Sequence, residues 1–133
     1  MQIAISETPS NKIAQAIAWL REHFTQSLFI GELAERVGMS VSSLHHHLKA
    51  VTATTPTQYQ KQLCLNEARR LMLVEFLDVG TAGYRVGYQS PSQFSPEYSR
   101  MYGLSPLREV GAMQRTIAAK LSVNASPTNL LSS

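Results

Sequence analysis

The stretch "IGELAERVG" at residues 30–38 ends in the same three letters as "VGTAGYRVG" at residues 79–87, and apolar residues at helical spacing follow each stretch. The two stretches align at an offset of 49 residues, which places Gly38 on Gly87. A one-residue slip in the turn makes the offset 50, and the alignment continues from there. The pairs aligned after the slip are Ser40 and Ser90, Leu44 and Phe94, Leu48 and Tyr98, Val51 and Met101, and Pro56 and Pro106. The sequence therefore contains two copies of one structural unit.

Each copy of the unit predicts two short helices joined by a tight turn. In the first copy, one helical face carries Ile30, Leu33, Ala34 and Val37. Gly38 follows as a residue that can adopt positive φ, and Ser40 can cap the next helix, whose buried stripe we expect to be Leu44, Leu48 and Val51. This is the helix-turn-helix pattern, whose second helix enters a DNA major groove. One copy would fit an ordinary helical hairpin equally well, but two copies favour DNA binding.

The rest of the chain predicts a helical scaffold around the two units. Residues 11–24 form a stripe that can cover the first unit, and 56–75 read as a helix that connects the two. At 1.5 Å per residue that helix spans about 28 Å, close to the roughly 34 Å between successive major-groove faces on one side of DNA. We therefore predict an all-α, homeodomain-like fold of about seven helices. Its expected parts are an N-terminal extension over 1–11, a first unit over 12–55, the connecting helix, a second unit over 78–113 that ends in a short closing helix at 106–113, and a flexible tail over 114–133.

Composition sets limits on the class of protein. A length of 133 residues, with 44% hydrophobic and 16% charged residues, is typical of one compact domain or two very small ones. Neither a long apolar run nor a leader is present, so we expect a soluble cytoplasmic protein without a membrane segment. The single cysteine, Cys64, agrees with a reducing compartment. The net charge of +3 weakly favours a polyanionic partner.

With these units in place, residues 12–113 resemble the DNA-binding domain of the AraC/XylS family of bacterial transcription regulators. The similar segments are "LAERVGMSVSSLHHHLKAVTATTPTQYQKQL", "NEARRLM" and "YRVGYQSPSQFSPEYSRMYGLSPLREV". The resemblance implies binding to double-stranded promoter DNA through two tandem units, action on RNA polymerase, and a monomeric DNA-binding part. In most members a sensing or dimerising domain comes first, whereas only about a dozen residues do so here. We expect a small stand-alone regulator or the C-terminal piece of a longer one.

The first unit offers a polar face for contact with bases. With Leu44 and Leu48 inward, the opposite face of their helix carries Ser42, His45, His46 and Lys49. Histidine and serine can bond base edges or phosphates, and lysine adds charge. In the family an arginine often stands where this chain has His46, so a titratable donor replaces a permanent one.

The second unit offers a poorer face. We expect Phe94, Tyr98 and Met101 inward and Ser92, Ser95, Pro96 and Ser99 outward, with Gln93 and Arg100 at the flanks. Pro96 threatens the helix by about 3 kcal/mol unless the helix starts late, with Ser92 as its cap. Gly80 and Gly83 are expected to weaken the preceding helix. We therefore predict an asymmetric binder in which the first unit supplies most of the sequence readout. The predicted DNA contacts are Ser42, His45, His46, Lys49, Ser92, Gln93, Ser95 and Arg100.

Other classes of function find little support. The run His45-His46-His47 cannot converge on one metal ion, because consecutive helical residues splay by about 100°. The sequence contains neither a Gly-rich phosphate-binding loop nor a recognisable set of Ser, His and acid residues, so nothing in it suggests an enzyme. No cofactor is expected. The serious alternative is a truncated regulator whose impaired second unit has left a helical domain that binds proteins.

Overall fold

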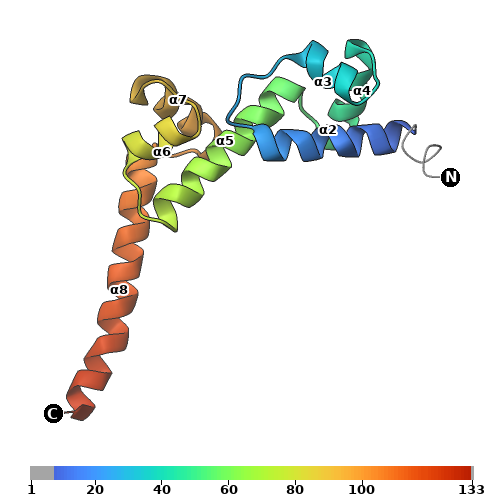
Figure 1. The fold of residues 1–133 in the computed structure, drawn as a ribbon. Helices are drawn as coiled ribbons and strands as arrows, with labels where there is room; N and C mark the ends of the chain where they lie inside the picture. Colours follow the sequence, from blue (N-terminus) through green and yellow to red (C-terminus); the bar gives the residue numbers. More distant parts are fainter. Residues whose placement is uncertain (1–7, 133) are drawn as a thin grey trace. The chain divides into compact units, whose positions relative to one another are not determined.

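The protein is described by a computed structural model that covers residues 8–132, with side chains placed through residue 123. All regular structure in this range is helical, which confirms the predicted all-α fold of about seven helices (Figure 1). The helices are α2 (Pro9–His23), α3 (Ile30–Arg36), α4 (Val41–Thr52), α5 (Pro56–Leu73), α6 (Val79–Arg85), α7 (Pro91–Tyr102) and α8 (Pro106–Ser132). The chain divides into two compact units, Met1–Glu67 and Ala68–Ser133, and α5 contributes residues to both.

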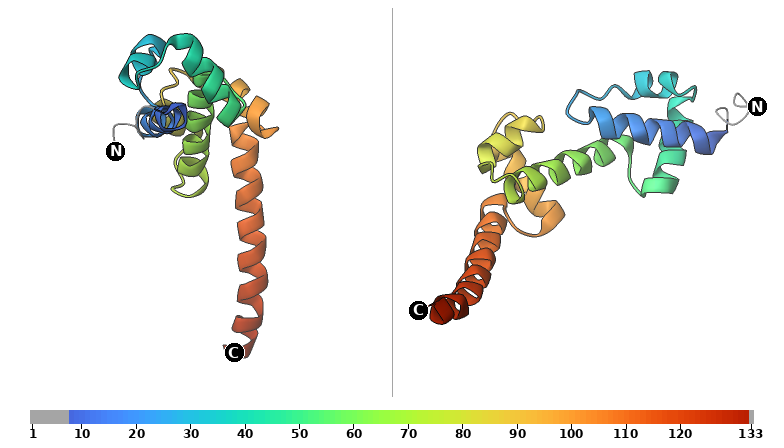
Figure 2. Two further views of the ribbon diagram at one scale, coloured as in Figure 1. Left: turned by 90° about the vertical axis from the view of Figure 1, so that its right-hand side faces the viewer. Right: turned by 60° about the horizontal axis from the view of Figure 1, so that its bottom comes forward.

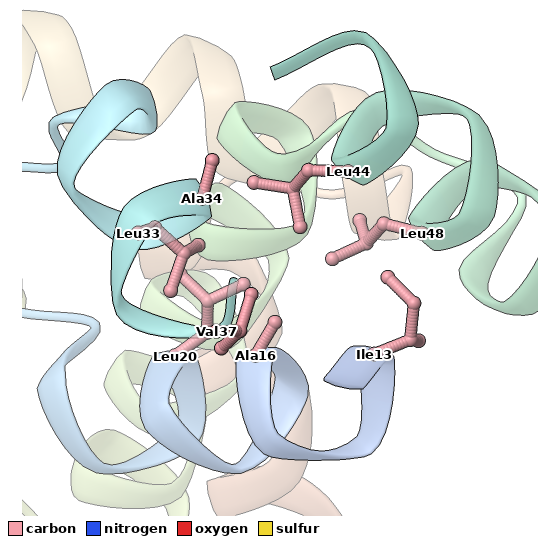
Figure 3. Close-up of a cluster of buried hydrophobic side chains, with 8 residues drawn as sticks. All are labelled: Ile13, Ala16, Leu20, Leu33, Ala34, Val37, Leu44 and Leu48. Carbon is pink, nitrogen blue, oxygen red and sulfur yellow. The ribbon is translucent and has the colours of Figure 1, made fainter. Parts of the chain in front are cut away.

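The core of the first unit lies between α2, α3 and α4. Figure 3 shows its side chains pointing toward one another: Ile13, Ala16, Leu20, Leu33, Ala34, Val37, Leu44 and Leu48. Tyr59 and Leu63 of α5 pack against this cluster. The core therefore uses the apolar stripes that helical spacing predicted for α2, α3 and most of α4.

Val51 is an exception to the predicted stripe, because its side chain is 64% exposed. It lies in the last turn of α4, where a shallow depression of about 350 Å³ separates it from Pro9 and Ser10 at the start of α2. Among the described residues of α2, Pro9, Ser10 and Ile13 line this depression and leave most of the Val51 side chain exposed. Helical spacing places a residue on a face but does not decide how far the covering helix extends.

The turn between the helices is built in the same way in both units. Gly38 and Gly87 adopt positive φ values of 72° and 106°, as predicted for residues that end a helix. The amide of Met39 donates to the carbonyl of Ala34 at 2.8 Å, and in the second unit Tyr88 donates to Gly83 at 3.0 Å. The repeated sequence motif thus forms the same helix C-cap in both units.

The helix that follows the turn has different caps in the two units. In the first unit Ser40 caps α4 as predicted, since its Oγ accepts from the amide of Ser43 at 3.1 Å. In the second unit the N-cap is Ser90, and its side chain makes no cap hydrogen bond. Helix α7 therefore does not start late with Ser92 as its cap, and Pro96 lies inside the helix. Burial of Phe94 and Tyr98 on the inner face of α7 offsets the cost of this proline.

Gly83 has a packing role that its helix propensity did not suggest. A Cβ at this position would stand 2.9 Å from Cδ2 of Phe94, so the aromatic ring needs the missing side chain. The aligned residues of the first unit are Ala34 and Leu44. A smaller residue on α6 therefore accompanies a larger residue on α7, and the expectation that Gly83 merely weakens α6 is incomplete.

The closing helix is longer than predicted. A short helix at 106–113 followed by an irregular tail was expected, whereas α8 continues through Ser132 (Figure 2). Residues 113–123 are all exposed, so tertiary packing does not cause this part of the extension. The extension follows instead from residues with high helix propensity, among them Ala112, Met113, Gln114, Arg115 and Lys120. The expected flexibility of 114–133 concerns motion and stays a prediction.

Candidate nucleic-acid interface

The outer face of α4 gathers the four side chains that the sequence predicted for the first unit. Ser42, His45, His46 and Lys49 are all exposed, whereas Leu44 and Leu48 on the opposite face are fully buried. Helix α4 carries no carboxylate that would repel phosphates. The face is therefore a continuous donor-rich strip that can meet the edges of base pairs.

Two contacts join α2 to α3 and to the turn that precedes α4. Nζ of Lys12 donates to the carbonyl oxygen of Gly38 at 3.0 Å, which ties α2 to the turn. The guanidinium of Arg36 stacks over the ring of Trp19 at 5.3 Å from the centroid. Sequence reasoning missed both contacts. The partners lie far apart in the sequence, so no local pattern could reveal them.

The histidine run forms no metal cluster. The rings of His46 and His47 lie 5.2 Å apart and tilted, and His47 is half-buried. Among the residues that the structure describes, no group of three or more histidine, cysteine or acidic side chains could hold a metal ion. The exposed histidines face outward as separate hydrogen-bonding groups.

The outer face of α7 is rotated slightly from the prediction. Ser92, Gln93, Pro96 and Arg100 are exposed, whereas Ser95 and Ser99 are half-buried. Met101, expected inward, is 38% exposed because it lies in the last turn of α7, before the C-cap Gly103. The exposed strip thus runs through Gln93, Pro96 and Arg100 and leaves Ser95 at its edge.

A polar network that the sequence did not suggest holds α7 in the second unit. Glu109 of α8 accepts two hydrogen bonds from Arg69 of α5, at 3.1 and 3.0 Å, and another from the hydroxyl of Tyr98. The Arg69 guanidinium also lies 4.7 Å from the ring centroid of Tyr102. Burial and the bond to Glu109 raise the pKa of Tyr98. Arg69 and Glu109 are 40 residues apart, which is why no sequence spacing predicted the pair.

Helix α6 begins at a side-chain cap. Asp78 is this cap, because it accepts from the amide of Thr81 at 3.0 Å and from its hydroxyl at 2.6 Å. These bonds from Thr81 hold the pKa of Asp78 below its usual value. Because α6 supports the inner face of α7 through Gly83, this cap helps to position α7.

The architecture has known counterparts. A family of helix-turn-helix domains matches residues 33–109, which is more than half of the chain. An AraC-type DNA-binding regulator from Chromobacterium violaceum has the same fold, with a TM-score of 0.72 and 25% identity over 78% of this chain and 93% of that one. The chain belongs to the AraC/XylS family. Family membership confirms the resemblance drawn from the two repeated units.

Other members of the AraC/XylS family are similar over most of this chain. The transcriptional activator RhaS of Salmonella schwarzengrund is 35% identical over 95 residues, or 71% of this chain and 34% of that protein. RhaS of Escherichia coli O139:H28 is 31% identical over 100 residues, which are 75% of this chain and 36% of that protein. The DNA-binding domain of AdpA, solved in complex with a target DNA, matches with a TM-score of 0.71 at 25% identity over 78% of this chain and 94% of that one. The chain spans about a third of the length of the curated relatives it matches.

These relatives are named for transcription regulation and DNA binding, not for enzymatic activity. No helix in the described part of the chain is long and apolar enough to cross a membrane.

Proposed function

We propose that this chain is a sequence-specific DNA-binding transcription regulator that reads two adjacent major-groove segments of a bacterial promoter. One observation carries the proposal. Helices α4 and α7 stand at equivalent places in two similar units, and each exposes a polar strip opposite a fully buried apolar one. Such a helix can insert into a major groove while its inner face keeps it fixed to the domain.

The two strips differ in what they can read. On α4, Ser42, His45 and His46 would contact base edges, and Lys49 would contact the phosphate backbone. On α7, Ser92 and Gln93 would reach bases and Arg100 would bind phosphates, whereas Ser95 is half-buried and has less to contribute. The α4 strip is richer in donors, and we expect the first unit to supply most of the specificity.

The partners follow from this role. Double-stranded DNA is the ligand, supported by the AdpA domain that was solved with its target DNA. Action on RNA polymerase is the second part of the proposal, supported by relatives that are named transcriptional activators. We further expect a monomeric DNA-binding part, a cytoplasmic location and no cofactor.

A second candidate function is a helical domain that binds another protein and no longer reads DNA. The observation in its favour is Pro96, which lies inside α7 at the place that aligns with His46. Salt separates the two functions. Binding to DNA releases counterions and weakens steeply as salt rises, whereas an apolar protein contact does not.

The decisive experiment is selection from a pool of random duplexes of about 25 base pairs at two salt concentrations, followed by sequencing of the bound fraction. We expect two enriched blocks whose centres lie roughly 10 base pairs apart, as two heads on successive groove segments require. Enrichment of a single block would show that the first unit reads alone. Weak, salt-sensitive binding without any enriched sequence would contradict the proposal.

The asymmetry between the units has its own test with the selected duplex. Replacing His46 by alanine should weaken specific binding more than replacing Ser95 by alanine, because His46 is exposed on the outer strip and Ser95 is half-buried. A base contact of this kind contributes about 1–3 kcal/mol of discrimination. Equal losses for the two variants would show that the first unit does not dominate.

A further inference from the structure

We infer that Pro96 reads the 5-methyl group of a thymine in the groove segment that α7 enters. The inference rests on the proposed function and deepens it, because it assigns a class of base to the second unit. From the sequence alone, Pro96 is a threat to its helix. Its position in α7 gives it a different role.

Pro96 lies at the centre of the exposed strip. Gln93 stands three residues before it and Arg100 four residues after it, and all three are exposed. The opposite face of α7 is anchored in the core by Phe94 and Tyr98, of which 1% and 0% are exposed. In the alignment of the two units Pro96 coincides with His46, at the middle of the α4 strip. A helix docked by its outer strip would therefore press this ring against the floor of the groove.

The chemistry of the Pro96 ring limits the groups on base pairs that it can contact. Proline has neither a side-chain donor nor an amide hydrogen, so it cannot bond the polar edges of bases. The one apolar group that base pairs present in the major groove is the thymine methyl. Gln93, on the same strip, has the amide geometry that pairs with adenine. Together they favour segments rich in A·T pairs.

The neighbourhood of Pro96 permits such an approach. The carboxylate next to it, Glu97, is half-buried and accepts a hydrogen bond from the hydroxyl of Tyr88, which turns it away from the exposed strip. Arg100 forms no ion pair with the described residues and is available to phosphates one turn beyond the ring. The strip thus places an apolar contact between two polar ones.

The cost of an internal proline supports a functional reading. Pro96 interrupts the hydrogen-bond ladder of α7, and the exposed position offers no core packing in return. A common helix former at this site would stabilise the helix. Positions that break a local rule without a structural gain are where function is expected.

Uracil tests the inference, since it keeps every hydrogen-bonding group of thymine and lacks only the methyl. Thymines in the second enriched block of the selected duplex are replaced by uracil one at a time, and affinity is measured by fluorescence anisotropy. At one position we expect the protein to bind about threefold to fivefold more weakly, the effect of losing one buried methyl. The variant Pro96→Gln should bind thymine and uracil duplexes equally.

The control variant is Ala118→Gln, which places the same side chain on an exposed position of α8 and should keep the sensitivity to uracil. Pro96→Gln removes an internal proline and should melt at or above the temperature of the unmodified protein, so misfolding will not explain its result. Indifference of the unmodified protein to uracil at every position of the second block would overturn the inference, as would retained sensitivity in Pro96→Gln. The absence of a second block would overturn it too. Absence of any enriched sequence would instead contradict the proposed function itself.

Discussion

At the residue scale, the two units fill equivalent core positions with side chains of different size. Ala34 and Leu44 meet in the first unit, and the aligned residues Gly83 and Phe94 meet in the second. Both aligned pairs are buried, and the larger ring of Phe94 takes the space that a methyl on Gly83 would need. Cores tolerate such exchanges when the total volume is conserved.

The first prediction concerns this pair. Gly83→Ala should lower the free energy of unfolding by about 1–2 kcal/mol, because overpacking outweighs the gain in helix propensity. Gly31→Ala is the matched control within α3. A Cβ there would meet nothing within 4 Å, and we expect a gain of about 0.5 kcal/mol. Urea unfolding measures both variants.

The same packing argument predicts a rescue. Phe94→Leu alone should destabilise the protein by leaving a cavity, but together with Gly83→Ala it recreates the pair found in the first unit. The double variant should therefore be more stable than the sum of the two single losses indicates. Simple additivity would show that the two residues do not compensate one another.

At the element scale, the second unit uses a polar network where the first uses apolar packing. Tyr98 aligns with Leu48, and its hydroxyl gives α7 a bond to Glu109 on α8. Arg69 on α5 completes the network with two hydrogen bonds to the same carboxylate. Three helices thus meet at one charged group, and the orientation of α7 depends on it.

We predict that Glu109→Gln will lower the free energy of unfolding by on the order of 2 kcal/mol, because it weakens charge-assisted bonds to a side chain only 14% exposed. Glu75→Gln is the control. It changes the ion pair of Arg70 and Glu75, whose side chains are 46% and 47% exposed, and should cost less than about 1 kcal/mol. Urea unfolding measures both variants. If they lose equal free energy of unfolding, the network around Glu109 stabilises the fold no more than the exposed ion pair does.

At the scale of the whole molecule, α5 is the element that the two units share. Its first part bonds within the first unit, where Gln60 and Cys64 donate to the carbonyl oxygen of Phe24. Its last part bonds within the second unit through Arg69. We propose that this helix sets the spacing between the two reading heads, as its length suggested in the sequence.

Insertion of four alanines between Glu67 and Ala68 tests this role. The insertion leaves the contacts of each unit in place and lengthens the helix by about 6 Å. We expect selection from random duplexes to give a changed distance between the two blocks, or to lose the second block. The same insertion after Ala119 in α8 should change neither block, and an unchanged distance after the α5 insertion would contradict the proposal.

The sequence by itself determined the repeated unit, the helix order and the caps. Gly38, Gly87, Ser40 and Asp78 were readable because a cap and a tight turn depend on residues within a few positions of one another. The outer face of α4 and the buried residues Phe94 and Tyr98 of α7 followed from helical spacing, whereas the family resemblance followed from the similar sequence segments. The exposed residues Ser42, His45, His46 and Lys49 were accordingly found where the sequence placed them.

Only the tertiary structure decided what covers each face. Val51 is exposed beside a depression lined by Pro9 and Ser10, and Ser95 lies half-buried at the edge of its strip. The bonds of Glu109 to Arg69 and the contact that makes Gly83 necessary join residues from different helices. Local spacing has no information on such contacts, because burial depends on the length and position of the neighbouring element and on the volumes that meet there.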